Sequence, residues 1–445
     1  MNLRDPLIAQ VDAEGRLVLP AKVTAELGLA PGSAVSLDLL ENGYRLHRPV
    51  EHLAKVYVEP TSRCNLNCRT CIRNAWEEPM GDMTAETFAR VLEGLQAFDP
   101  PPAVFFGGFG EPLAHPSTLD MVAQVKALGS PKVGLITNGC LLNERVSTAL
   151  IEAGLDDLWV SLDGIRPESY GDVRLGAYLP QVLDNLREFK ETRERLRLTP
   201  LSYDDRLKYE LFTQTWTGDP ERHVLPTLKP RLGIAFVAMR RNIADLPKLW
   251  AAGRDLGATQ FLVSNVIPYT KDLVPEILYP DLLGMGPVPT LWHDSVRMPV
   301  MQVNETTSRV LAGALSWYDW QFGGTDVSGV TRSCPFIEGG TTSIGWDGKV
   351  SPCLALVHSH TEFFGDQERK ITRHVAGNLR ERGLKEIWSD PGYVDFRRRV
   401  QEFDFPPCVA CGGCNLFETN EEDCEDDTFP RCGACLWAHG LIRCP

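Results

Sequence analysis

Between residues 55 and 267 the chain alternates between two hydrophobic patterns. Short apolar runs typical of buried strands occupy residues 55–60, 103–106, 132–137, 157–164, 233–239 and 260–267. Apolar residues at helical spacing occupy the intervening segments 84–98, 117–128, 143–153, 180–195 and 245–256. Strands and helices that alternate across short loops predict a parallel sheet covered by helices. We therefore predict an α/β fold in which residues 51–270 form a partial (β/α)6 TIM barrel.

Residues 1–50 show a different pattern, with two strand pairs around a short helix. Strand-like runs at 8–12 and 16–20 enclose one turn, and runs at 34–40 and 44–47 enclose another. The helical segment between them, residues 20–29, ends at Gly28. This region is predicted to be a separate small β-hairpin domain.

The remainder of the chain divides at about residue 330. Residues 271–330 are rich in proline and aromatic residues and have little periodicity, so we expect a bridge or a substrate-facing insertion. Residues 331–445 are rich in cysteine and begin with a predicted hairpin whose turn is Asp347-Gly348. We interpret this segment as a third structural domain.

Three thiols follow the first strand of the predicted barrel in the spacing C-x3-C-x2-C, namely Cys64, Cys68 and Cys71. Thiolates are soft ligands that suit iron-sulfur clusters, and three of them leave one iron of a [4Fe-4S] cluster without a protein ligand. Such an open iron is a reaction site. A zinc knuckle is the alternative, but it requires a fourth Cys or His nearby, and no His follows the thiols until His115.

Polar residues and glycines collect where the predicted strands end. The carboxyl ends of barrel strands are where enzymes of this architecture place their sites, and glycine allows the backbone to approach a ligand. For each residue alone, a turn or a helix cap is the alternative. The candidates are Gly107, Gly108, Glu111, Thr137, Asn138, Ser161, Asp163, Arg174 and Asn265.

In this order, from about Val56 to about Pro268, the thiols and strand ends resemble the radical S-adenosylmethionine (SAM) enzymes. In that family the open iron chelates the amino and carboxylate groups of SAM, and an electron from the cluster cleaves SAM to a 5'-deoxyadenosyl radical. The resemblance implies anaerobic chemistry, with reduced ferredoxin or flavodoxin as electron donor. It also implies that Arg174 points toward the SAM carboxylate. The other candidates are then expected to line the SAM site, namely Gly107, Gly108, Glu111, Thr137, Asn138, Ser161, Asp163 and Asn265. The insertion of Phe109-Gly110 departs from the family's glycine turn.

Nine further cysteines lie near the carboxyl end and resemble a SPASM extension, which carries auxiliary [4Fe-4S] clusters in enzymes that modify peptides and proteins. They are Cys334, Cys353, Cys408, Cys411, Cys414, Cys424, Cys432, Cys435 and Cys444. The resemblance implies two auxiliary clusters. Each cluster takes four ligands, so two clusters use eight of the nine thiols. One thiol is therefore structural or one cluster is incomplete, and a zinc site of four cysteines remains open.

Two further resemblances concern the ends of the chain. Residues 408–445 resemble the radical SAM maturases associated with tungsten cofactor oxidoreductases, which implies partnership with an aldehyde ferredoxin oxidoreductase-type enzyme. Residues 11–33 resemble the AbrB/SpoVT swapped-hairpin family, whose members bind DNA as dimers. Residues 1–50 contain five Lys or Arg and six Asp or Glu, too little positive charge for phosphate contacts. We therefore favour partner recognition or a homodimer over DNA binding.

Composition limits the partners and the cellular location that the sequence predicts. The 445 residues carry a net charge of -14, which disfavours nucleic acid and anionic membranes as partners. The sequence has no apolar run of transmembrane length and no secretory signal, so a cytoplasmic protein is expected. Thirteen cysteines in such a chain indicate metal binding, and the isolated Cys140 is expected to be a buried thiol.

These features together predict a radical SAM enzyme that modifies a partner protein or peptide, in a system that includes a tungsten-dependent oxidoreductase. A ribosomal-peptide maturase that forms thioether or carbon-carbon crosslinks is one alternative. A DNA-binding iron-sulfur redox sensor built on the N-terminal segment is another. SAM cleavage would support either enzyme, whereas cluster-dependent DNA binding without cleavage would support the sensor.

Overall fold

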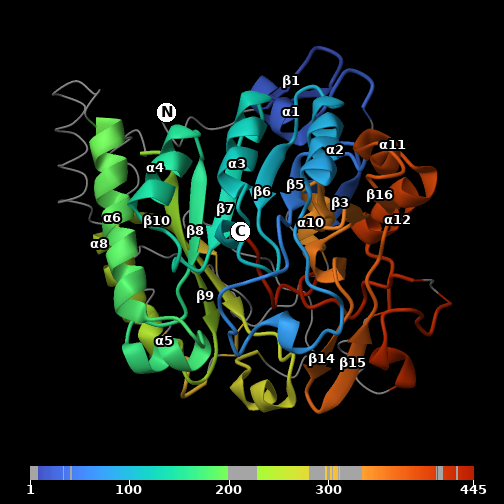
Figure 1. The fold of residues 1–445 in the computed structure, drawn as a ribbon. Helices are drawn as coiled ribbons and strands as arrows, with labels where there is room; N and C mark the ends of the chain where they lie inside the picture. The colour runs from blue at the N-terminus through green and yellow to red at the C-terminus, as the bar shows by residue number, and fades with distance from the viewer. Residues whose placement is uncertain are drawn as a thin grey trace.

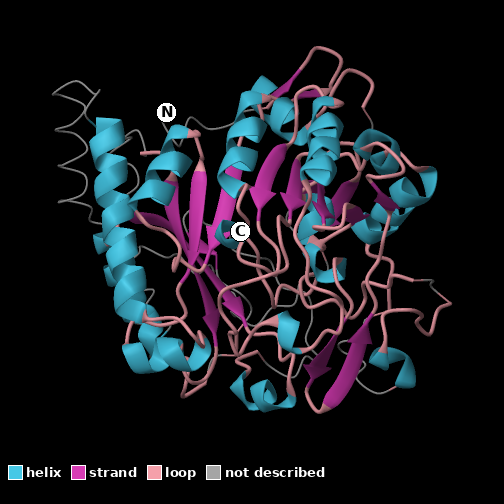
Figure 2. Cartoon of the chain, viewed as in Figure 1, coloured by secondary structure: helices cyan, strands magenta, loops and turns pink. Residues whose placement is uncertain are grey.

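One mixed sheet runs through the middle of the molecule (Figures 1 and 2). The structure is a computed structural model that describes residues 9–33, 35–40, 43–198, 228–279, 296–297, 301–302, 304–308, 310, 333–406, 408, 414–426 and 429–445. In spatial order, the ten strands are β11 (Val296–Arg297), β10 (Ala258–Asn265), β9 (Arg231–Ala238), β8 (Asp157–Ser161), β7 (Val133–Thr137), β6 (Ala103–Phe106), β5 (Lys55–Val58), β12 (Thr341–Ile344), β13 (Lys349–Ser351) and β16 (Gly377–Asn378).

The predicted partial barrel is confirmed. Strands β5 to β10 lie side by side in chain order, and each pairs with the next in parallel. The sheet extends beyond the six predicted strands, because β12 pairs in parallel with β5 and β11 pairs in parallel with β10. Since β12 belongs to the C-terminal domain, that domain and the barrel share one sheet.

Helices cover one face of this sheet (Figure 1). They are α2 (Ala85–Gln96), α3 (Thr118–Ala127), α4 (Glu144–Glu152), α6 (Leu179–Leu198) and α8 (Leu246–Asp255), with the short η3 (Ile243–Asp245) before α8. Helix α5 (Pro167–Val173) lies beyond the strand ends, at the bottom of Figure 1. Thr84 caps the start of α2, because its hydroxyl accepts a hydrogen bond from the Thr87 backbone N–H at 3.1 Å. Helix α5 was not predicted from the sequence.

Alternate residues of the strands face opposite sides of the sheet, as the period of a strand requires. In β5 and β6, Val56 and Val104 belong to the core beneath the helices. Tyr57 and Phe105 belong to a second core on the other face, which Trp437 of the C-terminal domain joins. The aromatic face of the barrel is therefore covered by the end of the chain.

The N-terminal segment forms two hairpins and a helix, as the sequence predicts. The elements are β1 (Gln10–Val11), β2 (Leu17–Val18), α1 (Ala21–Leu27), β3 (Leu37–Leu40) and β4 (Gly43–Leu46). Helix α1 ends at Gly28, which has a φ of 69° in the left-handed region that glycine favours. His47 anchors the module to the C-terminal domain through a 2.9 Å contact with Glu338.

The C-terminal domain is built around hairpins and short helices. They are α10 (Pro335–Glu338), β14 (His360–Phe364), β15 (Gln367–Ile371), α11 (Leu384–Trp388), α12 (Pro391–Glu402), η5 (Leu354–Leu356) and η6 (Asn415–Glu418). The predicted turn at Asp347-Gly348 is confirmed between β12 and β13. Elements β14, β15, α11 and α12 were not predicted.

Most of the predicted bridge at 271–330 lies outside the described residues. Its described parts include η4 (Lys271–Glu276) and β11, which adds an edge strand to the sheet. In the part of the chain that the structure describes, no helix has the length and apolarity needed to cross a membrane.

Candidate functional site

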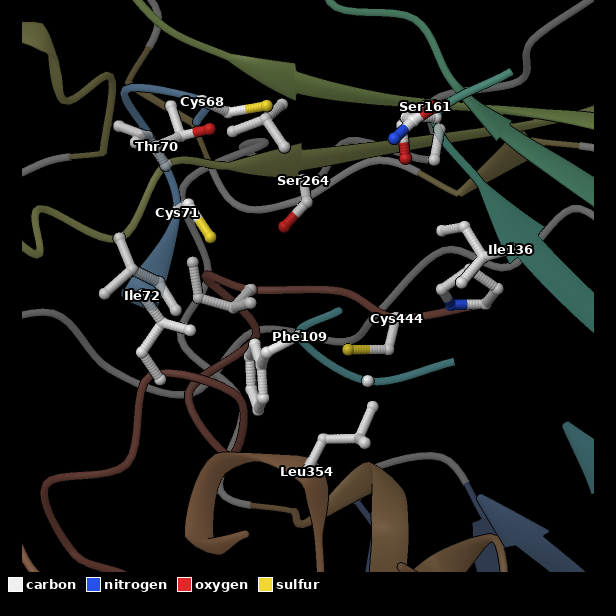
Figure 3. A pocket seen from close by; sticks show the side chains of 18 of the residues that line it. Cys68, Thr70, Cys71, Ile72, Phe109, Ile136, Ser161, Ser264, Leu354 and Cys444 are labelled. Carbon is white, nitrogen blue, oxygen red and sulfur yellow. The ribbon is translucent and has the colours of Figure 1, made fainter. Parts of the chain in front are cut away.

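A cavity of about 300 Å³ lies where the parallel strands end, between the barrel and the C-terminal domain. Its wall combines a loop after β5, a turn after β6, the ends of β7 to β10 and residues from the end of the chain. Figure 3 shows Cys71 and Cys444 on opposite sides of this space. The cavity therefore joins segments from the beginning, the middle and the end of the chain.

The loop after β5, residues 60–77 and hereafter the thiol loop, brings all three predicted thiols to the cavity. Cys64, Cys68 and Cys71 line it, and the short helix η1 (Ile72–Asn74) follows them. Two donors approach the sulfur atoms: the Leu66 backbone N–H lies 3.4 Å from Cys64 Sγ, and Arg73 Nε lies 3.3 Å from Cys71 Sγ. Hydrogen bonds and positive charge of this kind stabilise thiolate ligands.

The thiols do not form a closed metal site. Within the described ranges, no three His, Cys, Asp or Glu side chains are arranged so that they could hold a metal ion. Burial raises the pKa of Cys64 and of Cys68 above the ordinary value of a thiol. A metal site whose ligands must lose protons assembles together with its metal, so this arrangement is compatible with cluster binding.

The turn after β6, residues 107–112 and hereafter the glycine turn, passes close to the thiol loop. At Gly110 an added Cβ would lie 2.0 Å from the Thr61 carbonyl oxygen. At Gly108, where φ is 154°, an added Cβ would lie 2.7 Å from the Glu59 side chain. Gly108 and Gly110 line the cavity, whereas Gly107 lies behind it against Ile136. Close approach of two backbone segments explains the glycine at position 110.

Glu111, at the end of the glycine turn, is buried at the cavity wall. Its carboxylate accepts hydrogen bonds from the Thr137 hydroxyl at 2.7 Å, the Asn138 N–H at 2.7 Å and the Leu113 N–H at 3.0 Å. Burial nevertheless raises its pKa above the ordinary value, because three hydrogen bonds offset only part of the desolvation. The side chain thus fixes the end of β7 to the glycine turn.

Arg174 and Asp163 form a buried ion pair beside the thiols. Arg174 Nη2 lies 2.6 Å from Asp163 Oδ2, and Asp163 Oδ1 accepts from the Val237 N–H at 2.7 Å. Burial alone would lower the pKa of Arg174, but the charges of Asp163 and Cys68 raise it. Arg174 lines the cavity and Asp163 does not, so Asp163 orients the guanidinium from behind.

Three other predicted residues, Asn138, Ser161 and Asn265, also reach the cavity. Asn138 Nδ2 donates to Asn65 Oδ1 in the thiol loop at 2.8 Å, and Asn265 Nδ2 donates to the Leu441 carbonyl at 2.9 Å. Cys140 is half-buried against the helical core and is not part of the cavity wall. Burial raises the pKa of the Cys140 thiol to about 11.

Sequence reasoning missed that the end of the chain returns to the barrel. The Arg443 N–H donates to Ser264 Oγ at 3.0 Å, and the Pro445 carbonyl oxygen accepts from the Tyr57 hydroxyl at 2.8 Å. Cys444 lies on the cavity, with the Trp437 indole N–H 3.2 Å from its sulfur. No local signal in the sequence indicates these contacts, because the partners are 179 and 388 residues apart.

The remaining cysteines of the C-terminal domain fall into two groups. The first group consists of neighbouring thiols, namely Cys334, Cys353, Cys432 and Cys435. Burial raises the pKa of Cys353 and of Cys432, and the charges of the other thiols in the group raise both pKa values further. Cys408 is likewise close to Cys414 and Cys424. The Arg431 guanidinium donates to Cys408 Sγ at 3.1 Å. Cys411 lies outside the described residues.

Comparison with known proteins agrees with this geometry. Residues 58–198 match the Radical SAM superfamily, and residues 334–415 match SPASM, an iron-sulfur cluster-binding domain. The crystal structure of SuiB from Streptococcus suis bound to S-adenosylmethionine has the same fold, with a TM-score of 0.50 and 15% identity over 83% of this chain and 72% of that one. These matches define a radical SAM enzyme that carries a SPASM domain.

Two relatives refine this class. The tungsten-containing aldehyde ferredoxin oxidoreductase cofactor-modifying protein of Pyrococcus furiosus is 30% identical over 393 residues, which cover 88% of this chain and 96% of that protein. A probable GTP 3',8-cyclase of Methanothermobacter thermautotrophicus is 35% identical over 125 residues, 27% of this chain and 39% of that protein. The chain therefore belongs to the radical SAM/SPASM family that includes the tungsten-containing aldehyde ferredoxin oxidoreductase cofactor-modifying protein. Its domains imply a [4Fe-4S] cluster, SAM and auxiliary iron-sulfur clusters.

Proposed function

We propose that this enzyme uses SAM in the cavity to begin a radical modification of a partner protein or peptide within a tungsten-dependent oxidoreductase system. The observation that carries the proposal is that the thiol loop, the glycine turn and Arg174 line one cavity. Similarity across 88% of the chain to a tungsten-containing aldehyde ferredoxin oxidoreductase cofactor-modifying protein supports the choice of system. Reduced ferredoxin or flavodoxin is the proposed electron donor.

The donor set fits the cofactors of this family. In the proposed arrangement Cys64, Cys68 and Cys71 hold the [4Fe-4S] cluster, which with bound SAM supplies a 5'-deoxyadenosyl radical. Arg174 binds the SAM carboxylate, and because Asp163 holds its guanidinium in place, little side-chain freedom is lost on binding. Glu111 and the glycine turn receive the SAM amino group, since a carboxylate that accepts three hydrogen bonds retains acceptor capacity.

The cysteines of the C-terminal domain form two sets, which suggests that each set binds one auxiliary cluster. We assign Cys334, Cys353, Cys432 and Cys435 to one cluster, because their thiols are mutual neighbours. The other cluster takes Cys408, Cys414 and Cys424, together with Cys411, which is added because of its spacing in the sequence. Cys444 is then the ninth thiol and lies on the cavity instead of in a cluster.

The test of the proposed function is an anaerobic reaction of the reconstituted enzyme with SAM, reduced flavodoxin and the tungsten oxidoreductase that lacks its mature cofactor. We expect 5'-deoxyadenosine together with a mass change in that protein or in its extracted cofactor. SAM cleavage with a mass change only in a precursor peptide would replace this proposal with a peptide maturase. Cluster-dependent DNA binding without SAM cleavage would replace it with the redox sensor.

Replacing Arg174 should weaken SAM binding. In Arg174→Gln the loss of a charge-assisted contact to a carboxylate should raise the dissociation constant for SAM by about ten- to a hundredfold. Equilibrium binding under anaerobic conditions measures this change. Arg166→Gln is the matched control, since Arg166 pairs with the buried Asp245 at 2.8 Å but does not line the cavity. Equal affinity in both variants would remove Arg174 from the SAM site.

The N-terminal module is proposed to pair two chains or to hold the partner. Val11, Leu17, Val18 and Leu37 are 70%, 65%, 50% and 60% exposed on two short hairpins. Apolar side chains beside open strand edges favour a cover by another chain. Deletion of residues 1–50 would also remove the buried His47, so point variants are the sharper test.

The Val11→Ser/Leu17→Ser/Val18→Ser variant should lower partner capture or dimerisation by about tenfold, since each lost apolar contact weakens association. Analytical ultracentrifugation and a partner pull-down measure these effects, and SAM cleavage should be unchanged. Leu175→Ser is the control, because Leu175 is 40% exposed on the barrel. Sequence-specific DNA binding that this triple variant abolishes would contradict the proposal.

A further inference from the structure

Outside the cavity wall, a buried histidine of the C-terminal domain bridges two carboxylates of the barrel. His358 Nε2 lies 2.9 Å from Glu59 Oε2, and His358 Nδ1 lies 2.7 Å from Glu78 Oε2. The side chains of His358 and Glu59 are each 2% exposed, and that of Glu78 is 21% exposed. With a carboxylate at each ring nitrogen, the imidazole donates at both positions as a cation.

The charges of His358 and Glu78 depend on each other. Burial alone would lower the pKa of His358, but its hydrogen bonds to Glu59 and Glu78 raise it to about 9. Burial would raise the pKa of Glu78, but His358 and the Ser359 N–H lower it to about 2. Arg373 also contacts Glu78: its Nη1 lies 3.5 Å from Glu78 Oε2 and 3.3 Å from Asp347 Oδ2. The imidazolium is therefore charged at neutral pH.

The two carboxylates stand at the two ends of the thiol loop. Glu59 follows β5 immediately before the loop, and Glu78 follows it. Glu59 Oε1 also accepts from the Phe109 N–H of the glycine turn at 3.0 Å. One imidazolium thus connects both ends of the thiol loop and, through Glu59, the glycine turn.

Aromatic contacts extend this connection to the cavity itself. The His358 ring centroid lies 4.2 Å from that of Trp76 in the thiol loop and 5.9 Å from that of Phe109. Phe109 lines the cavity, where Figure 3 shows its ring near Leu354. A cation against an indole face gains electrostatic stabilisation that a neutral ring lacks.

We propose that His358 is a positioning residue by which the SPASM domain holds the thiol loop and the glycine turn in the geometry that binds SAM. This inference rests on the proposed SAM site. In the described part of the chain, His358 is the cation that pairs with Glu59. Removal of the imidazolium leaves a buried carboxylate without its partner, which is strongly unfavourable unless the backbone shifts to admit water. Such a shift moves the segments that line the cavity.

The test compares SAM affinity in His358→Gln, Glu59→Gln/His358→Gln and the wild type at pH 7.5. His358→Gln should raise the dissociation constant by about ten- to a hundredfold, because small misplacements at a binding site have effects of this size. The double variant should recover part of this loss, since it also removes the uncompensated carboxylate. His374→Gln is the control, because His374 is a half-buried histidine of the same domain that packs against Phe396 and Phe429.

A pH profile provides a second readout that a purely structural histidine would not move. The pKa of His358 in the folded protein is raised above its ordinary value, so its stabilising charge is complete below about pH 6.5 and is lost as pH rises through about 9. The charged groups that face His358 directly are Glu59 and Glu78, and Arg373 and Asp347 lie beyond Glu78. Wild-type SAM affinity should therefore fall near pH 9, and the double variant should lack that step.

The outcomes separate this inference from the proposed function. Wild-type protein that fails to bind SAM would contradict the proposed function itself. Wild-type protein that binds SAM, with His358→Gln within twofold of it and the same pH profile, would overturn only the role of His358. Near-UV circular dichroism, with a Trp76→Phe variant to identify the Trp76 signal, reports whether the thiol loop has moved.

Discussion

The Cys64→Ala/Cys68→Ala/Cys71→Ala variant is expected to lose SAM cleavage and to keep about two thirds of its iron. Three [4Fe-4S] clusters predict about twelve irons per chain, and the variant should retain about eight. The reason is spatial separation: these thiols line the cavity under the barrel strands, whereas the other cysteine groups lie within the C-terminal domain. The measurements are iron and sulfide analysis after anaerobic reconstitution and chromatographic detection of 5'-deoxyadenosine.

A matched control for this variant is Cys140→Ala. Cys140 is a nearby thiol whose pKa responds to the charges of Cys64 and Cys68, yet it does not line the cavity. It should retain about twelve irons, four for each cluster. Undiminished 5'-deoxyadenosine from the triple variant under reducing conditions would remove the thiol loop from the catalytic site.

The second large effect should follow from Cys353→Ala or Cys432→Ala in the C-terminal domain. Each variant should lose about four irons, the content of one cluster, and should unfold at a lower temperature. Cys353 precedes η5 and Cys432 belongs to the segment that leads to Trp437, so their shared metal would join the hairpin to the end of the chain. Without metal, buried thiols alone must stabilise this contact.

Cys444→Ala is the matched control for the division of ligands. If Cys444 lies on the cavity and outside both clusters, its replacement should leave the iron content at about twelve. Loss of about four irons from Cys444→Ala would contradict the division. A wild-type content of about four irons with one or two zincs would show that the C-terminal domain is a zinc-stabilised clamp.

The pattern of the chain was sufficient to predict most of the barrel. Strand periodicity placed β5 to β10, and Gly28 marked the end of α1, because these features depend on neighbours in the sequence. The carboxyl ends of parallel strands meet at one edge, so Glu111, Asn138 and Ser161 could be grouped before their positions were known. The thiol loop was recognisable from its spacing alone.

The tertiary structure decided what long-range packing controls. It added β12 beside β5, returned Cys444 to the cavity, and grouped Cys334 with Cys435, none of which has a local signature. It also separated Arg174, on the cavity wall, from Asp163 behind it, since side-chain direction depends on the neighbouring strands. His358 and Glu59 are 299 residues apart, and the shared sheet helps to bring their domains together. Sequence thus determined the elements and the thiol loop, while the pairing of distant segments determined which side chains face the same space.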